Sequence, residues 1–143
     1  MKALQLWTVL GLVVPAVALA GPAAATPAVG VDVQTLSQNT VDGTEYTITT
    51  VTVAPGGSTG WHYHPGEVYG VIRAGTMTHY DGGCVIDELY NTGAAVAEGV
   101  GSGFVHNGLN QGSTPLVMDV TYINPAGTPL SVEAPAPTGC PVS

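Results

Sequence analysis

The sequence predicts an all-β domain, built as a barrel or a sandwich of short antiparallel strands. Apolar and polar residues alternate with the period of two that is typical of strands, as in residues 31–36 and in the β-branched run YTITTVTV at 46–53. Turn-forming residues (Gly, Pro, Asn and Asp) separate about eight such segments at nearly even spacing. No helical periodicity extends beyond a turn or two in the segments that follow residue 25, which excludes a parallel α/β sheet.

Strands are expected at residues 31–36, 46–53, 68–73, 76–80, 84–90, 94–97, 104–106 and 116–123. Together they fill a single barrel domain over residues 26–132, followed by a Pro-rich tail at 133–143. A domain of this length has room for one hydrophobic core and not for two.

Residues 1–25 have the organisation of a secretory signal peptide. A positive start at Lys2 precedes an apolar run over 6–20, and two small-residue cleavage sites follow at 18–20 and 23–25. A membrane anchor is the alternative, but it needs about 20 continuous apolar residues, and this run is shorter and contains Pro15. We therefore expect a secreted or extracytoplasmic protein with no membrane span after signal cleavage.

The charge of the chain excludes several classes of partner. After residue 25, Arg73 is the only Lys or Arg, against ten Asp and Glu residues in the whole chain. Such an acidic chain has no positive surface for phosphates, so nucleic acid is not an expected partner, and a small-molecule ligand or substrate is. The 45% apolar content argues for a folded domain rather than an acidic disordered tail, and a homodimer is compatible with it.

Two cysteines, Cys84 and Cys140, occur in a chain that is expected to be exported. In an oxidising compartment an isolated pair favours a disulfide over two free thiols. A bridge between them would close a long loop and stabilise the fold by roughly 4 kcal/mol on the loop-entropy argument. It would also tie the Pro-rich tail back onto the barrel.

Three of the four histidines form the pattern that points to chemistry. His62 and His64 are two residues apart, so on a strand both side chains lie on one face. If a neighbouring strand brings His106 opposite this pair, three imidazoles can bind one divalent ion (Fe, Mn, Zn, Ni or Cu) and leave positions open for water or substrate. The alternative is that the pair consists of ordinary surface or core histidines.

Two segments around these histidines resemble the conserved motifs of the cupin superfamily. Residues 57–75 (GSTGWHYHPGEVYGVIRAG) resemble the first motif, in which H-x-H follows a glycine and precedes a glutamate and a closing glycine. Residues 103–110 (GFVHNGLN) resemble the second motif. The resemblance covers residues 31–125 and implies a double-stranded β-helix, or jelly-roll barrel, of the type-2 conserved-barrel kind. It also implies metal ligation by His62, His64 and His106.

The glutamate of the first motif is where the sequence departs from the family pattern. The family places it four or five residues after the second histidine, whereas Glu67 follows His64 after three and the fourth position is Val68. Strand alternation then turns Glu67 away from the histidines, unless the turn at 65–66 shifts the register. Glu67 is therefore either a direct ligand or an outer group at the site.

Two further polar residues have open roles. Asn110 either forms a hydrogen bond that orients a ligand or is a turn residue. His79 lies within an expected strand without a partner at a suitable spacing, and is interpreted as an exposed or packed strand residue. No motif for a catalytic nucleophile is present, so the catalytic residues are unknown.

These observations leave three functional hypotheses. The first is a metal-dependent enzyme, dioxygenase-like or isomerase-like, that acts on a small organic molecule. The second is a non-catalytic module that binds a metal or a small ligand outside the cell. The third is a structural barrel whose histidines bind no metal. The pattern does not name the metal or the ligand, because fold resemblance alone does not choose a reaction.

Overall fold

The computed structural model describes residues 24–140. All but the last two residues of the expected signal peptide therefore lie outside the described part of the chain. The described residues form ten strands and no helix, and none of them belongs to a helix that could cross a membrane. The strands are β1 (Val29–Val41), β2 (Thr44–Ser58), β3 (His62–Tyr63), β4 (Glu67–Ala74), β5 (Thr76–Asp81), β6 (Ile86–Asn91), β7 (Ala95–Glu98), β8 (His106–Leu109), β9 (Leu116–Pro125) and β10 (Val132–Glu133).

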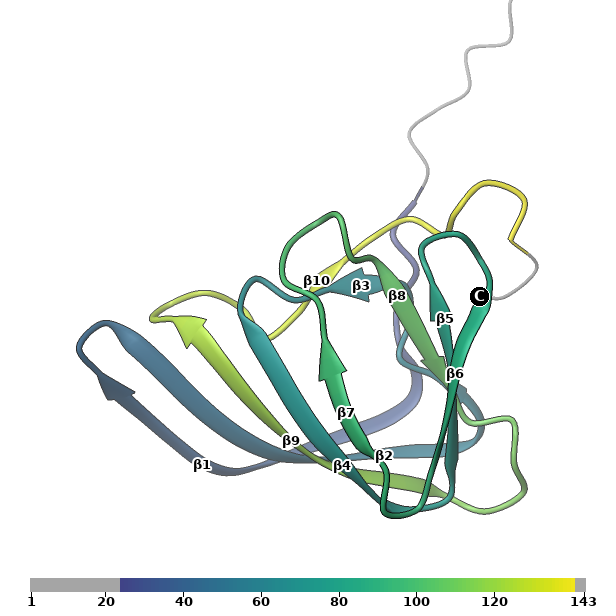
Figure 1. Ribbon diagram of the computed structural model, residues 1–143, viewed down its shortest axis with the longest axis horizontal. Helices are drawn as coiled ribbons and strands as arrows, with labels where there is room; N and C mark the ends of the chain where they lie inside the picture. Colours follow the sequence, from purple (N-terminus) through teal and green to yellow (C-terminus); the bar gives the residue numbers. More distant parts are fainter. Residues whose placement is uncertain (1–23, 141–143) are drawn as a thin grey trace, which may run out of the picture.

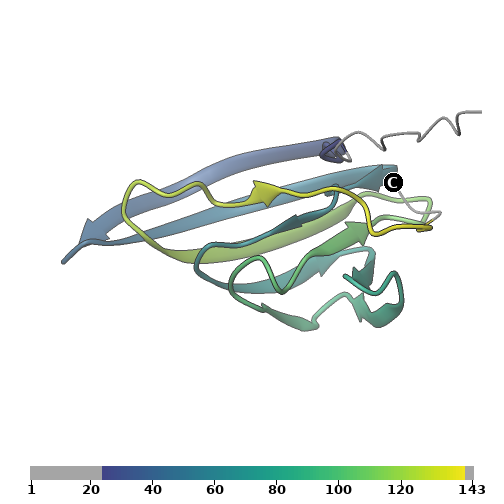
Figure 2. The ribbon, with the colours of Figure 1, turned by 90° about the horizontal axis from the view of Figure 1, so that it is seen from above.

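The strands form one antiparallel sheet that curls into a nearly closed barrel, which confirms the expected all-β jelly-roll architecture (Figure 1). The order along the main path is β10-β3-β8-β2-β9-β4-β7. β1 pairs with β2, while β5 pairs with both β6 and β8. Seen from above, the long β1–β2 hairpin extends beyond the other strands (Figure 2).

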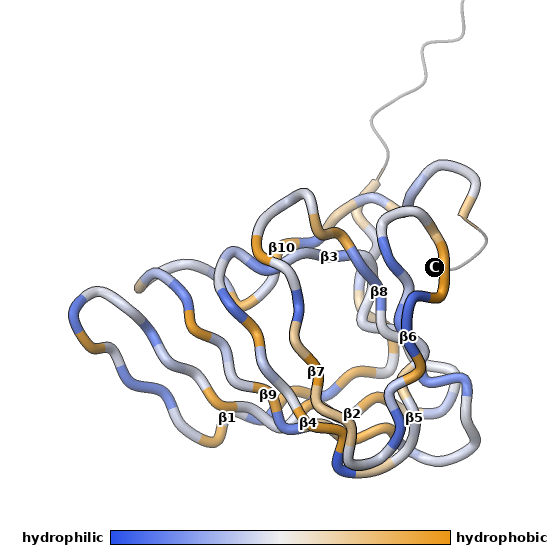
Figure 3. The backbone as a smooth tube through the Cα atoms, viewed as in Figure 1, coloured by the Kyte–Doolittle hydropathy of each residue, from blue (hydrophilic) through white to orange (hydrophobic). Residues whose placement is uncertain are grey.

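The core lies where β2, β4 and β9 face the barrel interior. Along β9 every second residue is buried, and β2 follows the same alternation from Thr47 to Val53. Val53 and Leu116 are fully buried, directly paired across β2 and β9. Figure 3 shows hydrophobic residues, in orange, where β2, β4 and β9 run side by side. Burial of this inner face is the main stabilising term of the barrel.

The expected strands are found, with differences at their ends. β1 and β2 are longer than the sequence pattern indicated, and β3 and β10 are short strands that it did not indicate. The segment expected at 94–97 is β7, which continues to Glu98. The segment expected at 104–106 begins only at His106, as β8.

The C-terminal region is tied to the barrel in two ways. The structure contains the expected disulfide between Cys84 and Cys140, with a Cα–Cα distance of 5.7 Å. Sheet pairing also continues past residue 132, the expected end of the barrel. The backbone N–H of the buried Ala134 donates to the Trp61 carbonyl, and Pro135 forms a bridge with Ala25. These contacts hold the first residues of the Pro-rich tail against the barrel.

Candidate metal centre

The three predicted histidines lie together inside the barrel. His62 begins β3 and His64 directly follows it, and the alternation of the extended chain turns both inward. β3 pairs with β8 so that His62 stands directly opposite His106, and their ring centroids are 4.4 Å apart. The rings of His64 and His106 are 5.1 Å apart. Two strands that are distant in sequence thus bring the three imidazoles together as predicted.

Backbone carbonyls fix the tautomer of all three rings. His62 Nδ1 lies 2.8 Å from the Gly60 carbonyl oxygen, and His106 Nδ1 lies 2.8 Å from that of Phe104. His64 Nδ1 lies 2.7 Å from the Leu130 oxygen, on the connection from β9 to β10. Because a carbonyl oxygen can only accept, each Nδ1 carries the proton, and each neutral ring presents the lone pair of Nε2. This outer hydrogen bond is the one that orients histidine ligands at metal sites.

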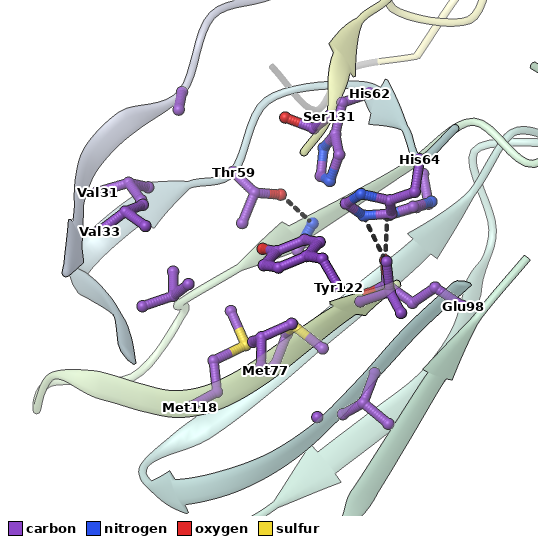
Figure 4. A pocket seen from close by; sticks show the side chains of 18 residues that line it. Val31, Val33, Thr59, His62, His64, Met77, Glu98, Met118, Tyr122 and Ser131 are labelled. Carbon is purple, nitrogen blue, oxygen red and sulfur yellow. Dashed lines mark hydrogen bonds and ion pairs between the residues drawn. The ribbon is translucent and has the colours of Figure 1, made fainter. Parts of the chain in front are cut away.

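A fourth side chain completes the cluster, and the sequence reasoning missed it. Glu98, at the end of β7, places Oε2 2.8 Å from His64 Nε2 and 2.7 Å from His106 Nε2. The neighbourhood of β3 explains the contact, because His64 forms a parallel bridge with Val100, just beyond β7. One ligand atom from each of His62, His64, Glu98 and His106 lies within 4.8 Å of the others. Figure 4 shows the side chains of His62, His64 and Glu98 converging above the interior of the barrel.

The polar atoms of this cluster are suited to a cation. Glu98 Oε2 and His106 Nε2 are buried and have no hydrogen-bond partner. With the protons held on Nδ1, the facing nitrogen and oxygen atoms are all acceptors, an arrangement that only a metal ion or an added proton stabilises. Two ligands at right angles, each about 2.1 Å from an ion, are about 3 Å apart, close to the distances from Glu98. The donor set therefore fits a divalent transition metal.

When no ion is bound, a proton stabilises part of this group of acceptor atoms. Burial would raise the pKa of Glu98, but the contacts with His106 and His64 outweigh it and hold the pKa well below its usual value. Burial would lower the pKa of His106, but the Glu98 carboxylate raises it above the usual value. For His62, burial and the neighbouring His106 lower the pKa to about 4. His62 is therefore neutral near pH 7, ready to bind an ion.

Glu67, the glutamate that the sequence offered as a ligand, lies on the outer face of the barrel. Its side chain is exposed and accepts a hydrogen bond from the Tyr69 hydroxyl, so the turn at 65–66 does not rotate it inward. The next residue, Val68, points inward and is 3% exposed. In the antiparallel pair of β4 and β7, Val68 stands directly opposite Glu98. The interior carboxylate therefore comes from the neighbouring strand, across from the position where the cupin pattern has it.

The two residues with open roles are also placed. Asn110 donates hydrogen bonds to the carbonyls of Val53 and Thr114 and accepts one from the Gly112 N–H, which are contacts typical of a turn residue. His79 is buried rather than exposed, and it has a partner that spacing did not indicate. Its Nδ1 contacts the Asp87 carboxylate, and its ring stacks on His106 at 5.1 Å. His79 thus packs directly behind one of the candidate ligands.

The structure is thus a small barrel with three imidazoles and one carboxylate turned into its interior. Comparison with solved structures gives the fold. A cupin domain from Bordetella pertussis Tohama I matches with a TM-score of 0.56 and 22% identity, over 66% of this chain and 94% of that one. An oxalate oxidase in complex with glycolate matches with a TM-score of 0.56 and 22% identity, over 72% of this chain and 54% of that one.

The polyketide cyclase RemF from Streptomyces resistomycificus also matches, with a TM-score of 0.54 and 17% identity, over 76% of this chain and 82% of that one. The chain therefore has the cupin fold, as the two sequence motifs indicated. No protein-family model and no curated protein matches the sequence. At these identities the likeness defines the fold and leaves the activity to be argued from the site.

Proposed function

We propose that the protein binds one divalent transition-metal ion through Nε2 of His62, His64 and His106 and the carboxylate of Glu98. One observation carries this proposal: backbone carbonyls occupy the three Nδ1 atoms, which leaves Nε2 of each ring for an ion, and one ligand atom from each of the four side chains lies within 4.8 Å of the others. A set of one carboxylate and three imidazoles suits iron, manganese, zinc, nickel or copper. Ions that take five or six ligands would keep positions open for a small molecule.

We further propose that the bound ion serves an exported enzyme that acts on a small organic molecule. When bound, the ion supplies Lewis-acid or redox chemistry to a substrate group held beside it. The chain's own residues orient that group and exclude water: the cluster borders a cavity of about 160 Å³ inside the barrel. The Tyr122 ring lies 5.7 Å from that of His64 and lines this cavity.

A non-catalytic ligand-binding module is the second candidate, and one observation favours it. Apart from the cluster itself, Tyr122 is the only ionisable side chain among the described residues that line the cavity. Burial raises its pKa to about 12, with the nearby Glu98 carboxylate adding to the shift, so it remains a neutral phenol at physiological pH. A neutral phenol can donate a hydrogen bond but does not serve as a base. Turnover by the ion-loaded protein separates an enzyme from a binding module.

The decisive experiment is elemental analysis of the purified mature chain, repeated after chelation and reloading with each of the five metals. We expect close to one ion per chain in the parent and in Glu67→Gln, whose side chain lies outside the barrel. His62→Ala, His64→Ala and His106→Ala should each lose most of the ion while still folding, because the core between β2 and β9 does not involve them. A parent that takes up no ion from any of the five salts would leave the third hypothesis, a barrel held by histidine–carboxylate contacts.

Export is tested separately. Intact mass of the secreted product should correspond to a chain that starts at Gly21 or Thr26, the residues after the two expected cleavage sites. Recovery of the uncleaved chain with free thiols would contradict export.

A further inference from the structure

The cavity beside the metal cluster is apolar on nearly every side. Below the four candidate ligands its walls come from β2, β4, β5, β7 and β9, and their side chains are those of Val51, Val68, Met77, Val96, Met118 and Val120. All six are less than 8% exposed, so these walls belong to the core. Figure 4 shows the two methionines on the side of the cavity away from the histidines. A ligand that reaches the ion therefore places its body against hydrocarbon.

The polar groups of the wall are few. The Thr59 hydroxyl already accepts a hydrogen bond of 2.8 Å from the Gly108 N–H. Thr59 is half-buried, and outside the cluster Tyr122 has the one buried polar group of the described lining. Ala28, Val33 and Ser131 line the cavity too, but they are exposed and form its mouth. The lining offers a ligand one or two hydrogen bonds beyond the ion itself, which is far from what a sugar or a polyol needs.

The lining also contains no cation. Arg73 is the only Lys or Arg of the described residues, and it lies on the outside of the barrel in an ion pair with Asp119. A divalent ion bound by Glu98 and three neutral imidazoles has a net charge of +1. A head group with one negative charge neutralises that centre, whereas a dianion leaves an unpaired negative charge against an apolar wall. An unpaired buried charge of this kind is costly.

From this lining we propose the ligand class of the site: a small, largely apolar molecule that coordinates the ion through one head group with a single negative charge. The proposal rests on the proposed metal site and adds what the site selects. The cavity volume of about 160 Å³ limits the apolar body to roughly the size of a benzene ring, because an apolar cavity of about 150 Å³ is known to hold benzene. Dicarboxylates and phosphorylated compounds are excluded by charge, and sugars by the lack of polar partners.

Three probes test the proposal on the full mature chain loaded with the ion that it retains best. Benzohydroxamate and acetohydroxamate share one monoanionic chelating head and differ by the phenyl ring, while oxalate is a dianionic chelator. We expect calorimetry to show benzohydroxamate binding at least tenfold more tightly than acetohydroxamate, because the phenyl ring is removed from water. Oxalate should bind more weakly than either. Elemental analysis after gel filtration distinguishes binding from removal of the ion.

Two variants locate the effect. Val96→Leu fills part of the cavity, and it should reduce the advantage of benzohydroxamate over acetohydroxamate at unchanged metal content. Val33→Arg adds a cation at the exposed mouth and should increase the affinity for oxalate at least tenfold. Leu36→Arg is its matched control, since Leu36 is equally exposed on β1 but does not line the cavity, and it should leave oxalate binding unchanged.

The outcomes separate the two proposals. A chain that takes up no ion overturns the metal site and, with it, the ligand class. A chain that takes up the ion but binds oxalate as tightly as benzohydroxamate, or binds the two hydroxamates equally, overturns the ligand class alone. An equal response of oxalate binding to Val33→Arg and Leu36→Arg would show that the added charge acts from the surface rather than at the mouth.

Discussion

The position of the interior carboxylate can be tested by moving it across the sheet. Val68 and Glu98 are direct partners in the antiparallel pair of β4 and β7, and both face inward. Opposite residues of such a pair have Cβ atoms about 4.5–5.5 Å apart, so a glutamate on either strand can reach the same point. The double variant Val68→Glu/Glu98→Val exchanges the two side chains and keeps the composition of the interior. It moves the carboxylate to position 68 on β4, where the cupin pattern has its glutamate.

The single variants set the scale of the effect. Removing a group that only orients a metal ligand costs about ten- to a hundredfold in affinity. Glu98→Val removes the ligand itself, so we expect a loss of at least a hundredfold, or about 2.7 kcal/mol. Val68→Glu alone places two carboxylates side by side in the interior, and it should destabilise the ion-free protein. The double variant should recover at least tenfold of the affinity that Glu98→Val loses, a coupling that independent sites do not show.

The assay is competition for the ion with a chromophoric chelator, with circular dichroism to confirm that each variant folds. Glu67→Gln is the matched control, since it removes a carboxylate one residue away from Val68 on the outer face, and its affinity should match the parent. If Glu98→Val binds the ion within threefold of the parent, Glu98 is not a ligand. If the double variant folds but binds no better than Glu98→Val, the argument from the strand register is wrong.

Four further predictions concern the cluster and the disulfide. The ion-free protein should lose stability as the pH falls from 6.5 to about 4, because the unfolded chain then binds a proton at His62 that the folded chain, with a pKa of about 4, does not; stability that is constant over this range would contradict it. Ion binding near pH 7 should release a proton from His106, whose pKa is raised, whereas His62, with a pKa of about 4, should release none above pH 5. Calorimetry at pH 5.5 in buffers of different ionisation heat should therefore show that fewer than three protons are released. Cys140→Ser should lower the free energy of unfolding by up to about 4 kcal/mol in denaturant titrations and leave one ion per chain. His79→Ala should weaken ion binding about tenfold, because it removes the ring that stacks on His106.

The fold and the three histidines could be predicted from the sequence because their signals are local. The period of two in β2 and β9 gives the strands, and the spacing of His62 and His64 places both on one face whatever the rest of the chain does. His106 could be predicted because the glycine-flanked motif around it resembles the second motif of cupins. Each of these inferences uses residues within one short segment.

Glu98 was not predicted because its role depends on which strand lies beside which. In the sequence Glu98 only ends a short strand-like segment that contains Val96. No feature within that segment indicates that it pairs with β4. One signal was nevertheless present. Val68 occupies the place where the cupin pattern has its carboxylate, so a carboxylate had to come from a neighbouring strand, and alternation with the buried Val96 turns Glu98 inward. The contacts of His64 with Leu130 and of His79 with Asp87 depend on tertiary pairing in the same way.

The location of the cluster predicts where an ion would stabilise the protein. His62, Glu98 and His106 lie on β3, β7 and β8, strands of two, four and four residues, and His64 directly follows β3. The core, in contrast, lies between β2, β4 and β9. The ion-free barrel should therefore fold, and its weakest backbone hydrogen bonds should be those around β3, which pairs with β10 through only two residues. An ion that bridges β3, β7 and β8 must leave before these strands separate, so hydrogen exchange there should slow on ion addition. Because the ion binds only the folded chain, exchange at the buried Val53 and Leu116, which requires global unfolding, should slow as well. Slower exchange at Val53 and Leu116 without any change around β3 would show that the ion binds outside the cluster, and no change at any amide would show that the protein does not bind the ion.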